Sequence, residues 1–136
     1  MPIEDKAILR ERLSIDRIVV IGASTSPGKA AHDVPAYLQR QGYTLDPINP
    51  FAETVLGETA YNSLEEVPGP IKLLDVFRPS DEVSNIVDAA IERGDVEVIW
   101  LQLGIHDDDA VQRAEDAGIE VVQDRCIKVV HGELFS

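Results

Sequence analysis

The sequence is poor in cysteine, in basic residues and in long apolar runs, and each shortage excludes a class of protein. Its single cysteine, Cys126, cannot close an internal disulfide, which favours a reducing compartment and leads us to expect a cytoplasmic protein. No apolar run approaches the roughly 18 residues of a membrane-spanning segment. Residues 1–14 also lack the apolar core of a signal peptide. We therefore expect neither a disulfide-stabilised secreted domain nor a membrane protein.

Acidic residues outnumber basic residues about two to one, and this imbalance limits the choice of partners. The chain has 25 Asp and Glu residues against 12 Lys and Arg residues, a net charge of −13. Such a surface repels nucleic acids and anionic membranes, so neither is expected as a partner. A halophilic host would tolerate the charge, because molar salt shortens the Debye length to about 3 Å. An ordinary acidic protein is the alternative.

The 136 residues are enough for one domain, 1–136, with a single core. Five apolar segments have the length and composition of strands, and amphipathic segments lie between them. The strands are expected at 17–21, 43–48, 72–77, 97–101 and 119–123, and the main helices at 30–41, 80–93 and 107–117. A further short helix within residues 1–14 is expected to pack on the domain.

This alternation predicts an α/β fold, namely a doubly wound, Rossmann-like parallel sheet of five strands with helices on both faces. We expect the strand order 3-2-1-4-5. In such sheets ligands bind outside the carboxyl ends of the strands, at the point where neighbouring strands diverge. The expected ligand site is therefore at this edge, between the first and fourth strands.

The helix expected to begin near residue 30 is the best candidate for holding an anion. The helices after the third and fourth strands begin with acidic residues, at 81–82 and 107–109. These acids already interact with the positive ends of the two helix dipoles. Residues 24–31 instead carry hydroxyls, small side chains and Lys29, and the first acid is Asp33. Backbone N–H groups at such a helix start can hold a phosphate. A plain tight turn with capping hydroxyls is the alternative.

Two familiar nucleotide signatures fail to match. The segment 22–30 resembles a P-loop, but it has one residue too many between its glycines, and Ala30 stands in place of Ser or Thr. An ATPase or GTPase is therefore not expected. The G-x-G-x-x-G pattern is missing, and the second strand ends in Asn49-Pro50 rather than in the acid that binds a ribose 2′-hydroxyl. An NAD(P)-binding enzyme of the reductase or epimerase type is disfavoured and is kept as the alternative function.

The loops that follow the five expected strands resemble those of the CoA-binding domain family. The matching segments are VIGAS at 20–24, INP at 48–50, DVFRPS at 75–80, WLQLGI at 100–105 and QDRCIK at 123–128. The family consists of small proteins similar to the N-terminal domain of the succinyl-CoA synthetase alpha subunit. The resemblance extends from about residue 15 to residue 130. It departs from the family pattern at Ile127, where proline often follows the Asp-Arg-Cys triplet.

The resemblance implies a binding site for coenzyme A, the expected cofactor, and assigns residues to its parts. The diphosphate is expected over Gly22, Ala23, Ser24 and Ser26, with Lys29 as charge partner. The adenine and ribose end is expected beside Asn49, Pro50, Phe77, Arg78 and Pro79. The pantetheine arm is expected to border Leu103, Gly104 and the loop from Asp124 through Arg125 to Cys126. Independently of the resemblance, the chemistry of the Gln102 amide suits it to orient a ligand carbonyl, and Gly104 permits close backbone approach.

Several of these residues also have simpler explanations. Arg78 can pair with Asp81 or Glu82 instead of a phosphate, and Cys126 can be a small buried side chain instead of a thiol that meets CoA. Trp100 lies within an apolar strand and is expected in the core. The three histidines show no metal-ligand pattern with the cysteine, so no metal site is expected.

The sequence thus predicts a protein that binds coenzyme A or an acyl-CoA at the carboxyl edge of its sheet. It shows no combination of nucleophile, base and orienting group that would support catalysis alone. We therefore expect a non-catalytic carrier, a sensor, or a partner of an acyl-CoA enzyme.

Overall fold

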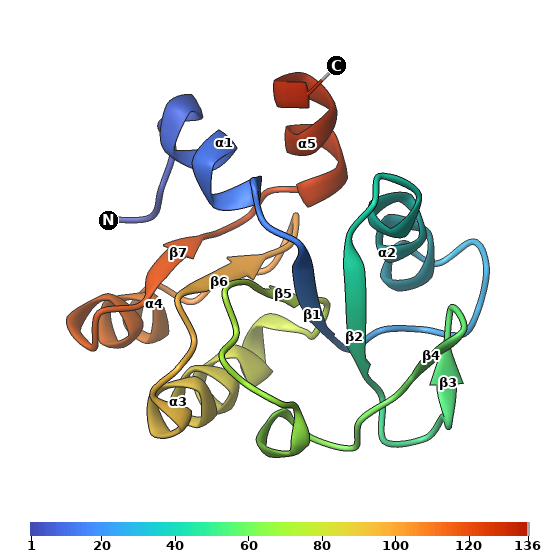
Figure 1. The fold of residues 1–136 in the computed structure, drawn as a ribbon. Helices are drawn as coiled ribbons and strands as arrows, with labels where there is room; N and C mark the ends of the chain where they lie inside the picture. The colour runs from blue at the N-terminus through green and yellow to red at the C-terminus, as the bar shows by residue number, and fades with distance from the viewer. Residues whose placement is uncertain (136) are drawn as a thin grey trace.

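A parallel sheet forms the centre of the molecule (Figure 1). In the computed structural model, which describes residues 1–135, this sheet has five strands in the order β2-β1-β5-β6-β7. The strands are β1 (Arg17–Ile21), β2 (Thr44–Ile48), β5 (Leu74–Val76), β6 (Val98–Leu101) and β7 (Glu120–Val122). A two-stranded hairpin, β3 (Thr54–Val55) and β4 (Glu58–Thr59), lies in the connection after β2.

Helices cover both faces of the sheet. They are α1 (Lys6–Leu13), α2 (Ala30–Arg40), α3 (Val83–Arg93), α4 (Asp108–Asp116) and α5 (Ile127–Phe135), with short 3₁₀ turns η1 (Leu64–Glu66) and η2 (Ser80–Glu82). Ile18 and Val20 of β1 pack with α1, α2 and α5, whereas Val19 packs with α3, α4 and η1. This alternation is the period of two that a strand covered on both faces requires. The predicted fold class, a doubly wound parallel sheet, is therefore confirmed.

The predicted strand order was wrong, because the third strand lies beside the first strand and not beyond the second. All three residues of β5 are buried, and β5 pairs with β1 on one side and with β6 on the other. β2 instead contains Pro47, which has no N–H to donate to a ladder and therefore suits an edge strand. The chain turns back across β1 after β2, so the topological switch point lies between β1 and β5.

The C-terminal helix α5 was not predicted from the sequence. Its valines, histidine and interior Gly132 are weak helix formers. Packing compensates for this weak propensity, since His131 is 7% exposed and its Nδ1 lies 2.7 Å from the Tyr37 hydroxyl of α2. The His131 ring also stacks on Phe135 with 4.8 Å between centroids. Within residues 1–135, no helix combines the length and apolar character needed to cross a bilayer.

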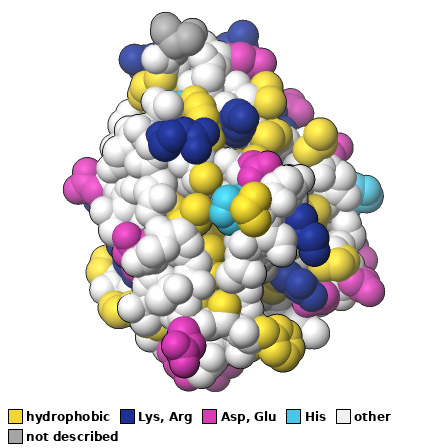
Figure 2. Space-filling view, turned by 90° about the vertical axis from the view of Figure 1, so that its right-hand side faces the viewer, with side chains coloured by type: hydrophobic (Ala, Val, Ile, Leu, Met, Phe, Trp, Pro, Cys, Tyr) yellow, Lys and Arg dark blue, Asp and Glu magenta, His cyan; other side chains and the backbone are white. Residues whose placement is uncertain are grey.

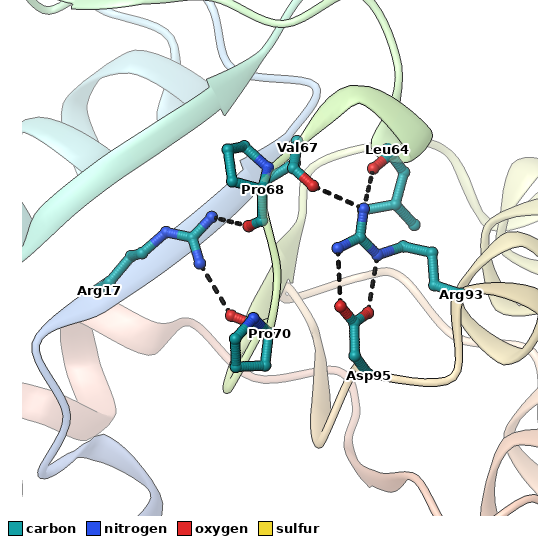
Figure 3. A network of polar contacts seen from close by, with 7 residues as sticks. All are labelled: Arg17, Leu64, Val67, Pro68, Pro70, Arg93 and Asp95. Carbon is teal, nitrogen blue, oxygen red and sulfur yellow. Dashed lines mark hydrogen bonds and ion pairs between the residues drawn. The ribbon is translucent and has the colours of Figure 1, made fainter.

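Two arginines hold the crossover that carries the chain from β2 to β5 (Figure 3). Arg17 of β1 donates hydrogen bonds to the carbonyl oxygens of Pro68 and Pro70, at 2.5 and 2.9 Å. Arg93, at the end of α3, donates to the carbonyl oxygens of Leu64 and Val67, at 2.7 and 2.8 Å, and pairs with Asp95 at 2.9 Å. The crossover is irregular, so its carbonyl groups would lack hydrogen-bond donors if it were held by packing alone. The two arginines supply these donors.

We expect Arg93→Ala to lower the free energy of unfolding by about 2–3 kcal/mol, because two carbonyl groups and a carboxylate lose a charged donor. The Arg93 side chain is only 11% exposed, so water cannot fully replace it. Arg113→Ala is the matched control. Arg113 pairs with Asp88, donates to only one backbone carbonyl, that of Ser84 at 3.2 Å, and is 41% exposed, so its loss should change stability by less than about 1 kcal/mol. Urea unfolding of both variants measures the difference, and equal losses would contradict the assignment.

Candidate functional site

A cleft of about 660 Å³ lies at the carboxyl edge of the sheet, where β1, β2 and β5 end. This is the switch point of the observed topology, at which ligands of doubly wound sheets bind. The expected site residues that line it are Gly22, Ala23, Ser24, Lys29, Asn49, Pro50, Phe77 and Arg78. The structure therefore brings together in one cleft most of the residues that were expected beside the diphosphate and beside the adenine end of the ligand.

The cleft depends on a close approach between the ends of β1 and β5 at Gly22. Gly22 has a φ of +85°, and a Cβ atom on it would lie 2.8 Å from the Phe77 carbonyl oxygen and 2.7 Å from Cδ of Arg78. Its N–H donates to the Ile48 carbonyl at 3.2 Å, and the Phe77 N–H donates to the Ile21 carbonyl at 2.9 Å. Gly22 thus ties the ends of β1, β2 and β5 together at the base of the cleft.

Asn49 fastens the loop after β1 to the loop after β2. Its Nδ2 donates to the Ala23 carbonyl at 3.0 Å, and its Oδ1 accepts from the Phe51 N–H at 2.8 Å. Both ends of this amide are therefore engaged within the protein, although the residue lines the cleft. Phe51, which sequence reasoning missed, is held beside it with 96% of its surface exposed and also lines the cleft.

The start of α2 presents donors to the cleft. Ser24 Oγ accepts from the Ser26 N–H at 3.0 Å, which leaves the Ser24 hydroxyl hydrogen free to donate to a ligand. Within residues 1–135, Lys29 makes no ion pair, and it lines the cleft. The helix start is less free of acid than expected, because Asp33 folds back and accepts from the Gly28 N–H at 3.2 Å. Hydrogen bonds from His32 and from the Gly28 N–H lower the pKa of Asp33.

Basic side chains are conspicuous on the face that carries α2 and the β3–β4 hairpin (Figure 2). Several Lys and Arg side chains lie toward the middle of this face, and most of its acidic side chains lie toward the outline. This distribution contrasts with the net charge of −13 for the whole chain. The cleft itself is lined by two basic residues, Lys29 and Arg78, and two acidic residues, Glu65 and Glu82.

Arg78 pairs with Glu82 at the wall of the cleft. Its Nη2 lies 2.6 Å from Oε2 of Glu82 and its Nε lies 3.1 Å from Oε1, so the guanidinium and carboxylate meet edge to edge. Both residues line the cleft, with side chains 45% and 43% exposed. The hydrogen bond from Arg78 lowers the pKa of Glu82, which is therefore ionised at neutral pH. The pairing of Arg78 with Glu82, the simpler explanation considered from the sequence, is thus present in the structure.

Beyond β5, the loops after β6 and β7 bind each other. The Gly104 N–H donates to Oδ1 of Asp124 at 2.6 Å. Trp100, buried in the core as expected, donates its indole N–H to the Arg125 carbonyl at 2.8 Å. Cys126 is partly buried against the core cluster of α1, α2 and α5. Of the expected site residues in the described chain, those outside the lining of the cleft are Ser26, Pro79, Gln102, Leu103, Gly104, Arg125 and Cys126.

A buried carboxyl group, Asp75, connects these loops, and sequence reasoning assigned it no role. Asp75 is 0% exposed; its Oδ1 accepts from Gln102 Nε2 at 2.7 Å, and its Oδ2 has no partner within residues 1–135. Gln102 Oε1 in turn accepts from the Ile127 N–H at 3.3 Å, at the first residue of α5. Burial raises the pKa of Asp75 to about 7. Both polar ends of the Gln102 amide are thus used inside the protein.

Most other lining residues that the sequence analysis missed come from the crossover after β2 and from α3. They are Phe51, Asn62, Ser63, Leu64 and Glu65 of the crossover, Glu82 of η2, and Asn85, Ile86 and Ala89 of α3. The wrong strand order placed these segments away from the first strand. Pro47 was the available signal, since a proline inside the second strand indicates an edge and so favours a third strand on the other side of β1.

A second hollow, of about 460 Å³, lies between the ends of α3 and α4 at the opposite edge of the sheet. Its walls include the carboxylates of Asp95, Glu97 and Glu120. The negative ends of two helix dipoles and three acids oppose an anion there. The cleft at the carboxyl edge is therefore the better candidate for a phosphorylated ligand.

The sequence matches known proteins along most of its length. The sequence model of the family described as CoA binding domain matches residues 16–132. Protein YneT of Bacillus subtilis (strain 168) is 37% identical over 127 residues, which are 93% of each chain. A structure from Thermus thermophilus, 38% identical, superimposes with a TM-score of 0.91 and covers 97% of this chain and 100% of that chain.

A more distant relative is part of a larger enzyme. The alpha subunit of the ADP-forming acetate–CoA ligase II from Pyrococcus furiosus is 27% identical over 124 residues. The match covers 84% of this chain and 27% of that subunit. The chain thus spans about a quarter of the ligase subunit.

We expect Gly22→Ala to destabilise the protein by at least about 2 kcal/mol, because a side chain there meets the Phe77 carbonyl and a positive φ is strained for alanine. Gly42→Ala is the control. Gly42 has a φ of +102° but open space around its Cβ position, so its replacement should cost only about 1 kcal/mol. Thermal unfolding of both variants compares the two effects. Losses of equal size would show that the close approach is unimportant.

Asp75→Asn should change how stability depends on pH. The pKa of Asp75 is about 7 in the folded protein against an ordinary 3.8, so the folded state binds more protons between these values. The contribution of Asp75 to the free energy of unfolding is therefore fully present below about pH 4. It is lost as the pH rises toward 7, and the loss is on the order of 4 kcal/mol. Asparagine keeps an oxygen for Gln102 and does not titrate. Urea unfolding at pH 5 and pH 8 gives the free energy of unfolding of both proteins. The variant should gain in stability relative to wild type at pH 8, and the same difference at both pH values would contradict this.

Proposed function

This chain is a member of the CoA-binding domain family, and we propose that it binds coenzyme A or an acyl-CoA in the cleft at the carboxyl edge of the sheet. The observation that carries the proposal is the cleft itself. It lies at the β1–β5 switch point and combines the start of α2 with the cationic side chains of Lys29 and Arg78. Its volume of about 660 Å³ is in the usual range for small-molecule sites.

In this proposal the diphosphate lies over the loop from Gly22 to Ser26 at the start of α2. Small side chains let the backbone N–H groups approach the phosphate oxygens, and the positive end of the helix dipole favours the charge. The Ser24 hydroxyl hydrogen and the Lys29 ammonium group add a donor and a charge. The exposed position of Lys29 on the cleft wall supports this assignment.

The adenine and ribose end lies beside the loops after β2 and β5. Asn49, with Pro50, shapes this end of the cleft, because its amide holds the two loops together. Phe77 and Arg78, followed by Pro79, form the opposite wall. The planar guanidinium of Arg78 matches a phosphate in shape and charge.

The pantetheine arm runs toward the loops after β6 and β7. Leu103 is 71% exposed there and offers an apolar surface. Gly104 and the Arg125–Cys126 segment border the same path, and Gln102 with Asp75 holds the start of α5 from beneath. Gln102 acts in this scheme through the backbone it positions, since its amide is already hydrogen-bonded on both sides.

The biological role of the protein is a further part of the proposal. We infer a carrier or sensor of CoA thioesters, or a partner of an acyl-CoA enzyme, in a cytoplasmic setting. The similarity to part of a ligase subunit supports the last of these, because that subunit has further segments outside the matched region.

Calorimetric titration with CoA, acetyl-CoA, NAD, NADP and ATP, at low and at high salt, tests the proposed ligand. We expect CoA or acetyl-CoA to bind, with affinity that falls as salt screens the phosphate contacts. Tight binding of NAD or NADP without binding of CoA would overturn the proposal and favour the reductase or epimerase alternative.

Lys29→Glu should weaken CoA binding by at least about 1 kcal/mol, because a charge-assisted contact is replaced by repulsion. Lys72→Glu is the control for net charge, since Lys72 is exposed at the opposite end of β5. The dissociation constants of the two variants are compared by calorimetry. Equal effects of the two substitutions would remove Lys29 from the site.

A further inference from the structure

The pair of Arg78 and Glu82 has a geometry that a bound phosphate would duplicate. Two nitrogens of the guanidinium face two oxygens of the carboxylate, at 2.6 and 3.1 Å. A phosphate monoester binds arginine through the same edge and with the same spacing of donors. While Glu82 occupies this edge, a ligand phosphate cannot use it.

Arg78 differs from the arginines that hold the fold together. Arg17 and Arg93 donate to backbone carbonyls as well as to carboxylates. Within residues 1–135, the Arg78 side chain donates hydrogen bonds only to Glu82. Its removal from Glu82 would therefore leave no carbonyl of the crossover unpaired.

The stem of Arg78 is held in place, while its charged end is exposed to the cleft. Cδ of Arg78 lies 2.7 Å from the position that a Cβ atom on Gly22 would occupy. The side chain is 45% exposed and lines the cleft together with Lys29. The guanidinium can consequently exchange partners without a change in the backbone.

Glu82 can also tolerate the loss of its partner. Its side chain is 43% exposed, so water solvates a released carboxylate. It lies directly before Val83, the first residue of α3, where the positive end of the helix dipole favours a negative charge. An exposed pair of this kind is weak in water and is open to displacement.

We propose that Glu82 is an internal competitor for Arg78, and that its displacement makes the cleft selective for ligands with a phosphate monoester. The proposal rests on CoA being the ligand, because CoA carries such a group on its ribose and dephospho-CoA does not. A monoester approaches a charge of −2 at neutral pH and so competes with a single carboxylate. The diphosphate linkage has less charge on each phosphate and is held elsewhere, at the start of α2.

The test compares Glu82→Gln with Glu65→Gln by calorimetric titration of CoA and dephospho-CoA. Both glutamates line the cleft, so the two substitutions remove the same charge, but only the first frees Arg78. We expect Glu82→Gln to raise CoA affinity about tenfold and to leave dephospho-CoA affinity nearly unchanged. Glu65→Gln should change both affinities by less than about twofold.

Arg78→Gln supplies the second arm of the experiment. This substitution should abolish the preference for CoA over dephospho-CoA, and adding Glu82→Gln to it should have no more effect than Glu65→Gln. Equal responses to Glu82→Gln and Glu65→Gln in the wild-type background would overturn the proposal and identify the pair as purely structural.

Adenosine 3′,5′-bisphosphate and adenosine 5′-monophosphate separate this inference from the proposed function, since neither contains the pantetheine arm. A wild-type protein that does not bind CoA, but whose Glu82→Gln variant prefers the bisphosphate, would overturn CoA as ligand and support the exchange. If wild type and Glu82→Gln show the same preference between the two nucleotides, the proposed replacement of Glu82 by a phosphate at Arg78 is overturned.

Discussion

The close contact between the ends of β1 and β5 at Gly22 is the constraint on which the site depends. No side chain fits between Gly22 and the Phe77 carbonyl, so the two strands end against each other and the loops diverge from a common point. The same contact holds the stem of Arg78 against β1. A positive φ makes the turn away from the strand possible. This one approach thus sets the base of the cleft and the position of Arg78 in its wall.

Carboxylates of the protein occupy some of the donors that an anionic ligand would use. Asp33 accepts the Gly28 N–H near the start of α2, and Glu82 takes the edge of Arg78. In a chain of net charge −13, such contacts satisfy exposed donors without a bound anion. Ligand affinity then depends on the difference between the hydrogen bonds that these donors make to the ligand and those they make to the protein carboxylates. This difference favours ligands with more negative charge than a carboxylate.

A buried polar connection joins loops that are far apart in the sequence. Asp75 of β5, Gln102 after β6 and the first N–H of α5 form a chain of hydrogen bonds beneath the edge of the sheet. Residues expected to touch a ligand, Gln102 and Asn49 among them, use their amides to position backbone. Side-chain amides are well suited to this work, because each has a donor and an acceptor and can join two loops.

The five main strands and four of the helices could be predicted from apolar periodicity, turn residues and caps, since these signals are local. Helix α5 could not, because its residues are weak helix formers and its stability comes from the packing of His131 against α2. Strand order depends on which apolar segments are buried on both sides. Pro47 indicated that the second strand lies at an edge, but a single proline does not say which other strand pairs with the first strand.

The sequence by itself determined the fold class and the family, because loop motifs after successive strands are read directly from the chain, and it predicted a candidate site at the carboxyl ends of the strands, although between the first and fourth strands. Only the tertiary structure decided which of those loops share a cleft and what each polar group binds. Gln102 and Asp75 are 27 residues apart, and the placement of β5 beside β1 brings the crossover and Glu82 into the cleft with Gly22. Such contacts arise from the packing of strands against one another, which no local pattern of residues records.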